Sequence, residues 1–299
     1  MIHCIFTKHD LSSFKPENDS FVGIDSDGCV FPTMEIKQKK CFHQNIIDHW
    51  RLEKIAKYVR ETAEFVNLYS IHRGQNRFLC LMLVMDLLRK RPEVSAAGVN
   101  LPGFDSLKKL IASGAPLSNF ELEKAAKNTG DEELALLLKW SHAVNEKISR
   151  TVKNIEPFKW VRESLRKIKR NSDAICVSQT PVEALEREWR EHGLTEFVRV
   201  IAGQELGTKK EHIRLATNGR YKNGKILMIG DAPGDREAAL ANRAHFYPIN
   251  PGHEEDSWER FYKAAYQKFL NGTYGGDYEN ELIAGFQELL PSAPPWECG

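Results

Sequence analysis

The sequence predicts an α/β protein built on a doubly wound parallel sheet that carries an inserted, mainly helical cap domain. Three observations predict this class. Short, almost continuous apolar runs end in polar residues, as do strands buried on both faces of a parallel sheet. Helix-period segments separate these runs, which is typical of strand–helix alternation. A long stretch of helical pattern, residues 32–156, separates the first run from the others.

The expected strands are three strong apolar runs at residues 21–24, 174–177 and 226–229, with weaker candidates at 197–202 and 244–249. Helical patterns follow them at 158–169, 181–192, 210–216 and 234–242. This alternation predicts a Rossmann-like core. In such sheets ligands bind beyond the carboxyl ends of the strands, so we expect the functional residues directly after the apolar runs.

The helical stretch is interpreted as a cap domain. Ile55, Val59, Ala63 and Val66 recur at helical spacing, which is the pattern of a helix face that packs into a core. We therefore expect residues 1–31 and 157–299 to form the core and residues 32–156 to form the cap. Two further helical patterns, at 258–269 and 278–290, are expected to pack on the core.

The composition excludes several classes of partner. Forty-two basic residues against 41 acidic ones leave a net charge of +1, which gives no general drive toward nucleic acid or an anionic membrane. The longest apolar run, residues 78–85, is far shorter than a bilayer span. The N-terminal residues lack the apolar core of a secretory signal, and the six cysteines form no CxxC pair. We expect a cytoplasmic protein that binds neither nucleic acid nor membrane.

Two acidic pairs follow expected strands. Asp25 and Asp27 come directly after the first apolar run, and Asp231 and Asp235 follow the run at 226–229. A DxD pair alone is commonly a surface feature, and an Asp at the start of a helix is commonly an N-cap. Carboxylates gathered in one cleft repel each other, however, and a divalent cation relieves that repulsion. Oxygen ligands of this kind suit Mg²⁺.

With two further segments, these pairs make up four motifs in order. They are residues 22–28 (VGIDSDG), 175–178 (ICVS), 208–213 (TKKEHI) and 230–235 (GDAPGD). In this order the chain resembles the haloacid dehalogenase-like hydrolase superfamily, over residues 21–31 and about 157–250. The first and fourth motifs are specific, whereas the middle two depend on their order.

The resemblance implies a Mg²⁺-dependent phosphohydrolase. Asp25 would attack phosphorus and form an aspartyl-phosphate, and Asp27 would act as general acid and then general base. The metal would be held by Asp25, the backbone carbonyl of Asp27 and Asp231, with Asp235 orienting the metal shell or the lysine. Ser178 would bind a phosphoryl oxygen. Dehalogenases of the superfamily lack the second Asp, so Asp27 favours phosphate over halide.

The sequence departs from the family pattern in two places. Cys29 stands where the family usually has Thr, and we expect little effect. The third motif offers two adjacent lysines. Lys209 is chosen because its spacing to His212 resembles family members with a KxxH pattern, and Lys210 is kept as the alternative.

Four further residues are candidates for substrate binding. Gly28 and Gln179 adjoin the first two motifs. Arg73 and Arg77 belong to the polar stretch 70–78 of the cap, which is interpreted either as a solvated turn or as a cap loop that offers bidentate donors to an anion.

The expected substrate is a small phosphorylated metabolite. The alternatives within the superfamily are a phosphomutase or a phosphonatase, and the alternative outside catalysis is a phosphate-binding protein. Because all four acidic residues are present, the catalytic interpretation is preferred. The sequence gives no information on the oligomeric state.

Overall fold

The chain divides into two compact units in the computed structural model, which describes residues 6–297. The first unit holds the chain up to Met34 together with Asn154–Pro291, and the second holds Glu35–Lys153 together with the tail that begins at Ser292. Among the described residues, no helix combines the length and apolar character needed to span a bilayer.

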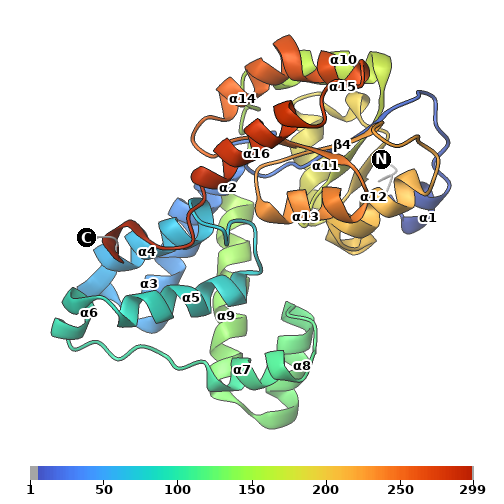
Figure 1. Ribbon diagram of the computed structural model, residues 1–299. Helices are drawn as coiled ribbons and strands as arrows, with labels where there is room; N and C mark the ends of the chain where they lie inside the picture. The colour runs from blue at the N-terminus through green and yellow to red at the C-terminus, as the bar shows by residue number, and fades with distance from the viewer. Residues whose placement is uncertain (1–5, 298–299) are drawn as a thin grey trace. The chain divides into compact units, whose positions relative to one another are not determined.

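The first unit contains a five-stranded sheet in the order β3-β2-β1-β4-β5, in which all neighbours are parallel (Figure 1). The chain runs outward from β1 through β2 to β3 and then crosses to β4 on the other side of β1. The topology is therefore doubly wound, and the predicted fold class is confirmed. The strands are β1 (Phe21–Ile24), β2 (Asp173–Val177), β3 (Val200–Ala202), β4 (Ile226–Gly230) and β5 (His245–Pro248).

The two weaker strand candidates are shorter than expected. The expected strand at 197–202 begins only at Val200, because Phe197 ends a 3₁₀ turn, η3 (Thr195–Phe197). Phe197 is nevertheless buried in the core. A buried turn residue adjoining a strand therefore extends the apolar run in the sequence beyond the strand itself.

Both faces of the sheet are covered, since side chains alternate along each strand. Val22 and Ile24 belong to one apolar cluster, and Phe21 and Met228 belong to another on the opposite face. Figure 1 shows α10, α14 and α15 on one side and α12 and α13 on the other. The helical segments of this unit are α1 (Lys8–Ser12), α10 (Val161–Asn171), α11 (Val182–Glu191), η3, η4 (Gln204–Leu206), α12 (Lys209–Thr217), α13 (Pro233–Ala241), α14 (Glu254–Arg260), η5 (Phe261–Ala265), α15 (Tyr266–Leu270) and α16 (Asp277–Glu288).

The second unit is helical. Its core surrounds Trp140, whose indole makes edge contacts with the rings of Phe42, Trp50 and Phe78. Side-chain N-caps begin α5, α8 and α9, as where the Asp131 carboxylate accepts the Leu134 N–H at 2.9 Å. Its helices are η1 (Lys37–Phe42, a π-helix), α3 (His43–Trp50), η2 (Glu53–Ile55), α4 (Ala56–Leu68), α5 (Arg77–Arg89), α6 (Pro92–Ala96), α7 (Asp105–Ala112), α8 (Asn119–Thr129), α9 (Glu132–Thr151) and η6 (Pro295–Glu297), and α2 (Thr33–Ile36) spans the boundary between the units.

The C-terminal tail groups with the helical unit, whereas the sequence analysis assigned it to the core. The indole of Trp296 lies 4.4 Å from the guanidinium of Arg91 and packs edge-on against Phe65. Arg91 is buried and pairs with Glu61 at 2.8 Å. A cation over an indole face is favourable, so this contact accounts for the position of the tail.

Asp173 is the first residue of β2, at the end of the sheet where the parallel strands begin. Its side chain connects several segments there. Its carboxylate accepts the backbone N–H groups of Glu17 at 3.0 Å and Asn18 at 3.1 Å. It also accepts the Tyr221 hydroxyl at 2.8 Å and pairs with Arg199 at 3.0 Å. A fully buried carboxylate with four donors ties the N-terminal segment, β3 and the loop before β4 to the start of β2.

We expect Asp173→Asn to lower the free energy of unfolding by about 3 kcal/mol, because the amide nitrogen would face donors and leave buried groups without an acceptor. The measurement is the urea midpoint followed by circular dichroism. Asp256→Asn is the control, since its side chain is 80% exposed. An unchanged midpoint for Asp173→Asn would show that these bonds do not stabilise the core.

Candidate active site

Three polar side chains follow three neighbouring strands at one edge of the sheet. Asp25 follows β1, Ser178 follows β2 and Asp231 follows β4, and their exposed fractions are 4%, 2% and 0%. The Asp25 N–H donates to the Ile229 carbonyl at 2.9 Å and the Ser178 N–H to the Ala202 carbonyl at 2.9 Å. The ladder bonds thus continue one residue past the strands and fix both backbones.

Lys209 joins two of the acidic residues. Its ammonium lies 2.9 Å from an Asp25 carboxylate oxygen and 2.7 Å from an Asp235 oxygen. Its side chain is only 17% exposed. Lys210, the alternative from the sequence, is exposed. The lysine that the structure places between the carboxylates is therefore Lys209.

Helix capping explains why Lys209 and Asp235 are aimed at each other. Thr208 and Glu211 form a reciprocal capping box, with bonds of 3.2 and 2.7 Å, that begins α12 at Lys209. Asp235 accepts the Ala232 N–H at 3.1 Å at the start of α13. One Asp235 oxygen therefore caps a helix and the other receives the ammonium, so the N-cap interpretation accounts for only half of this carboxylate.

Asp25, Asp231 and Asp235 form a cluster that fits a divalent cation. One carboxylate oxygen from each lies within 4.8 Å of the others, and all three residues are buried. Three carboxylates against one ammonium leave two negative charges unbalanced among these four groups. Because the ligand atoms are hard oxygens, the donor set suits Mg²⁺.

The pKa shifts of the clustered groups also fit a site for a cation. Burial raises the pKa of Asp25 well above its ordinary value, Lys209 offsets part of that rise, and Asp235 and Asp231 add to it. Burial likewise raises the pKa of Asp235. Burial alone would lower the pKa of Lys209, but Asp235 and Asp25 outweigh it and hold that pKa above its usual value. A bound cation would favour the ionised carboxylates in the same way.

The loop after β1 is a closed turn. Gly28 adopts φ 77° and its N–H donates to the Phe31 carbonyl at 2.8 Å, so the turn already uses the one donor that this residue offers. The Trp189 indole donates to the Ser26 hydroxyl at 3.0 Å. Cys29 is buried, and its thiol faces the Ile229 carbonyl at 3.9 Å.

Asp27 is half-buried and accepts two hydroxyl groups. Thr33 donates to one carboxylate oxygen, and Thr180 donates to the other at 2.6 Å. The sequence analysis missed both threonines. Thr180 could have been found from its place two residues after Ser178 at a strand end, whereas nothing in the sequence around Thr33 indicates its contact.

The loop after β2 orders Ser178 and Gln179. The Ser178 hydroxyl oxygen accepts the Thr180 N–H at 3.2 Å, which leaves its hydrogen to donate elsewhere. The amide nitrogen of Gln179 donates to the Gly207 carbonyl at 3.0 Å. That contact ties the β2 loop to the loop before α12, so Gln179 has a structural role in this arrangement.

The two arginines proposed from the sequence for substrate binding make contacts inside the helical unit. Arg73 is buried and donates to the Leu68 carbonyl at 2.9 Å. Arg77 donates to the Ser141 hydroxyl at 3.0 Å and to Asn145 at 2.7 Å, and its guanidinium lies 5.2 Å from the Phe42 ring centroid. A role of either arginine in substrate binding stays a prediction.

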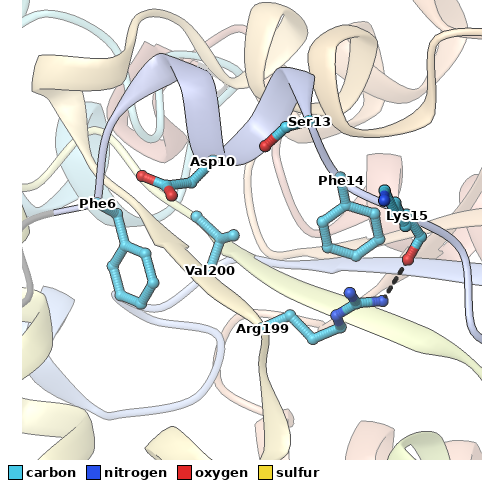
Figure 2. A pocket seen from close by; sticks show the side chains of 7 residues that line it. All are labelled: Phe6, Asp10, Ser13, Phe14, Lys15, Arg199 and Val200. Carbon is cyan, nitrogen blue, oxygen red and sulfur yellow. Dashed lines mark hydrogen bonds between the residues drawn. The ribbon is translucent and has the colours of Figure 1, made fainter.

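A pocket of ≈ 270 Å³ lies elsewhere on the core unit (Figure 2). It is lined by residues of the N-terminal segment with Arg199 and Val200, and Arg199 donates to the Lys15 carbonyl at 2.7 Å. Val200 is the first residue of β3. The pocket therefore lies near the end of the sheet where the strands begin, whereas the carboxylate cluster lies beyond the end where they finish.

Comparison with known proteins returned solved structures only, since no family model and no curated protein matches the chain. A haloacid dehalogenase superfamily hydrolase from Geobacter sulfurreducens is 13% identical, with 79% of this chain and 89% of that chain covered and a TM-score of 0.39. A haloacid dehalogenase-like hydrolase from Streptococcus pneumoniae is 13% identical, with 90% and 98% covered and a TM-score of 0.42. One from Xanthomonas campestris is 12% identical, with 78% and 83% covered and a TM-score of 0.42.

At such identities and TM-scores, the chemistry of this chain has to come from its own site geometry.

Gly230→Ala should disrupt the cluster, since a Cβ at this position would lie 2.3 Å from Cγ of Asp235 and 2.4 Å from its Cβ. Asp235 would have to move away from Lys209. We expect a loss of stability of about 2 kcal/mol or more, measured by thermal unfolding, and weaker Mg²⁺ binding, measured by calorimetry. Gly234→Ala is the matched control, because it lies in α13 with open space around its Cβ position. Equal stability and Mg²⁺ binding in the two variants would contradict this account of Gly230.

Proposed function

We propose that the chain is a Mg²⁺-dependent phosphohydrolase that cleaves a small phosphorylated metabolite through an aspartyl-phosphate on Asp25. The observation that carries the proposal is the ammonium of Lys209 between Asp25 and Asp235, within a buried carboxylate cluster beyond the carboxyl ends of β1 and β4. The nearly balanced net charge of +1 favours a small anion over nucleic acid as the substrate.

Asp25 is the proposed nucleophile. Asp235 uses both oxygens, one on the Ala232 N–H and one on Lys209. Asp25 follows β1 directly, and Lys209 binds its Oδ2. The ammonium favours the ionised carboxylate, which is the form that attacks phosphorus.

The metal would be held by Asp25, Asp231 and the backbone carbonyl of Asp27, with Asp235 supporting the cluster through Lys209. When bound, Mg²⁺ supplies positive charge to the phosphoryl oxygens during transfer. The ammonium of Lys209, beside Asp235, would add further positive charge near the phosphoryl oxygens.

Asp27 is the proposed proton donor and acceptor. A metabolite alcohol leaves as a basic alkoxide unless it is protonated, and a half-buried carboxyl two residues from the nucleophile can supply that proton. The Ser178 hydroxyl, whose oxygen accepts the Thr180 N–H, is placed to donate its hydrogen to a phosphoryl oxygen. A halide leaving group would need no such acid, so Asp27 favours phosphate esters.

The primary test is phosphate release from p-nitrophenyl phosphate and a panel of phosphorylated metabolites, with Mg²⁺ or with EDTA. We expect turnover that EDTA abolishes and that Asp25→Asn lowers by about 1,000-fold or more, because the nucleophile is lost. Asp256→Asn, at an exposed site, should keep wild-type activity. If the wild type releases phosphate from no monoester, the proposal is wrong, and phosphonates and sugar bisphosphates are the substrates to try next.

The two adjacent lysines give a second test. Lys209→Met should lower kcat by about 100-fold or more and reduce stability, since it leaves buried carboxylates without their counter-charge. Lys210→Met should change neither, because Lys210 is exposed. The measurements are steady-state kinetics and thermal unfolding. Comparable losses of activity in both variants would contradict the role given to Lys209.

A further inference from the structure

Both carboxylate oxygens of Asp27 are held by threonine hydroxyls that no motif contains. We propose that Thr180, assisted by Thr33, is a positioning residue that fixes the Asp27 carboxyl in the orientation needed for proton transfer to the leaving group. The inference rests on the proposed function, and its geometry lies wholly within the core unit. Thr180 donates at 2.6 Å to Oδ2 and Thr33 donates to Oδ1.

Thr33 reaches Asp27 because the intervening loop folds back on itself. The Ser26 carbonyl accepts the N–H groups of Val30 at 2.8 Å and Phe31 at 3.1 Å, and Asp27 forms a β-bridge with Phe31. Thr33 lies two residues beyond this bridge, at the first position of α2, and is fully buried. The closed turn therefore places the Thr33 hydroxyl against one carboxylate oxygen of Asp27.

Thr180 is fixed from a different part of the sheet. Its N–H donates to the Ser178 hydroxyl at 3.2 Å, and its carbonyl accepts the Gln204 N–H at 3.2 Å. Gly203 permits this approach, since a Cβ there would lie 2.6 Å from the Thr180 carbonyl oxygen. The loops after β2 and β3 are thus locked together, and they hold the second hydroxyl in place.

Two fixed donors, one on each oxygen, define the plane of a carboxylate. The terminal torsion of Asp is intrinsically broad, and these two bonds restrict the directions in which a proton-bearing oxygen of Asp27 can point. A hydroxyl suits this position because it donates to a carboxylate and accepts from a protonated carboxyl. Thr180 and Thr33 can therefore hydrogen-bond to Asp27 both as a carboxylate and as a carboxyl.

The step that depends on this orientation is the first one. A carboxylate oxygen of Asp25 forms a bond to phosphorus, and the bond from phosphorus to the ester oxygen breaks with its electron pair on that oxygen. The ester oxygen takes the proton of the Asp27 carboxyl and departs as the alcohol. Water then bonds to phosphorus, gives its proton to the Asp27 carboxylate, and the electron pair of the acyl-phosphate bond returns to Asp25.

The experiment measures kcat and KM for a series of aryl phosphates of increasing leaving-group basicity, from p-nitrophenyl to phenyl phosphate, with Mg²⁺ present. A basic leaving group needs the proton most, so misplacing Asp27 should harm phenyl phosphate most. For Thr180→Val we expect a loss of kcat/KM, which reports the step in which the leaving group departs, at least about 10-fold greater with phenyl phosphate than with p-nitrophenyl phosphate. Thr33→Val should give a loss in the same direction, and Thr180→Ser, which keeps the hydroxyl, should restore the wild-type dependence.

Thr217→Val is the matched control. Thr217 is buried in the same unit, and its hydroxyl donates to the Ile213 carbonyl at 2.8 Å within its own helix. This variant should keep the wild-type dependence on the leaving group. Thermal unfolding of each variant separates a folding defect from a change in the chemical step.

A second measurement uses the Asp27→Asn background and the first-turnover release of p-nitrophenolate, which leaves without a proton. If Thr180 acts through Asp27, adding Thr180→Val should cause no further loss. An equal loss of kcat/KM across the aryl series, or additive losses in the double variant, would overturn the inference while leaving the proposed function intact. Absence of turnover in the wild type would overturn both.

Discussion

The contact of Lys209 with Asp25 and Asp235 is the interaction on which the site depends. Burying these charged groups away from water costs free energy. The burial is tolerated only because the ammonium and the carboxylates lie at hydrogen-bond distance from each other. The same contact joins α12 and α13 to the end of β1, so the position of two helices and the ionisation of Asp25, the proposed nucleophile, depend on one interaction. The capping of each helix supplies the direction in which its side chain points.

The Asp173 contacts and the candidate active site lie at opposite ends of the parallel strands. At the edge where β2 begins, Asp173 gathers four donors and fastens segments far apart in the chain. Beyond the carboxyl ends of the strands, carboxylate oxygens of Asp25, Asp231 and Asp235 lie within 4.8 Å of one another. Such an arrangement opposes folding unless a cation joins it, so the candidate site relies on the rest of the unit for its stability.

The position of Asp27 shows how much a loop adds to a motif. The DxDG segment brings two carboxylates near each other, but the closed turn and the β2 loop decide what each can do. Asp25 faces an ammonium, and Asp27 faces two hydroxyls. Two carboxylates two residues apart thereby acquire different partners, which is the condition for different roles in one reaction.

Patterns local to the chain could be predicted from the sequence. The strands at 21–24, 174–177 and 226–229 follow from apolar runs, and the meeting of Asp25, Ser178 and Asp231 follows from the rule that parallel strands end at one edge. The choice between Lys209 and Lys210, the contacts of Thr33 and Thr180 with Asp27, the internal contacts of Arg73 and Arg77, and the docking of Trp296 were decided only by the tertiary structure. Each of these contacts depends on which segments, distant in the sequence, pack together in the folded chain. The spacing of residues within one segment carries no information about the segment that packs against it.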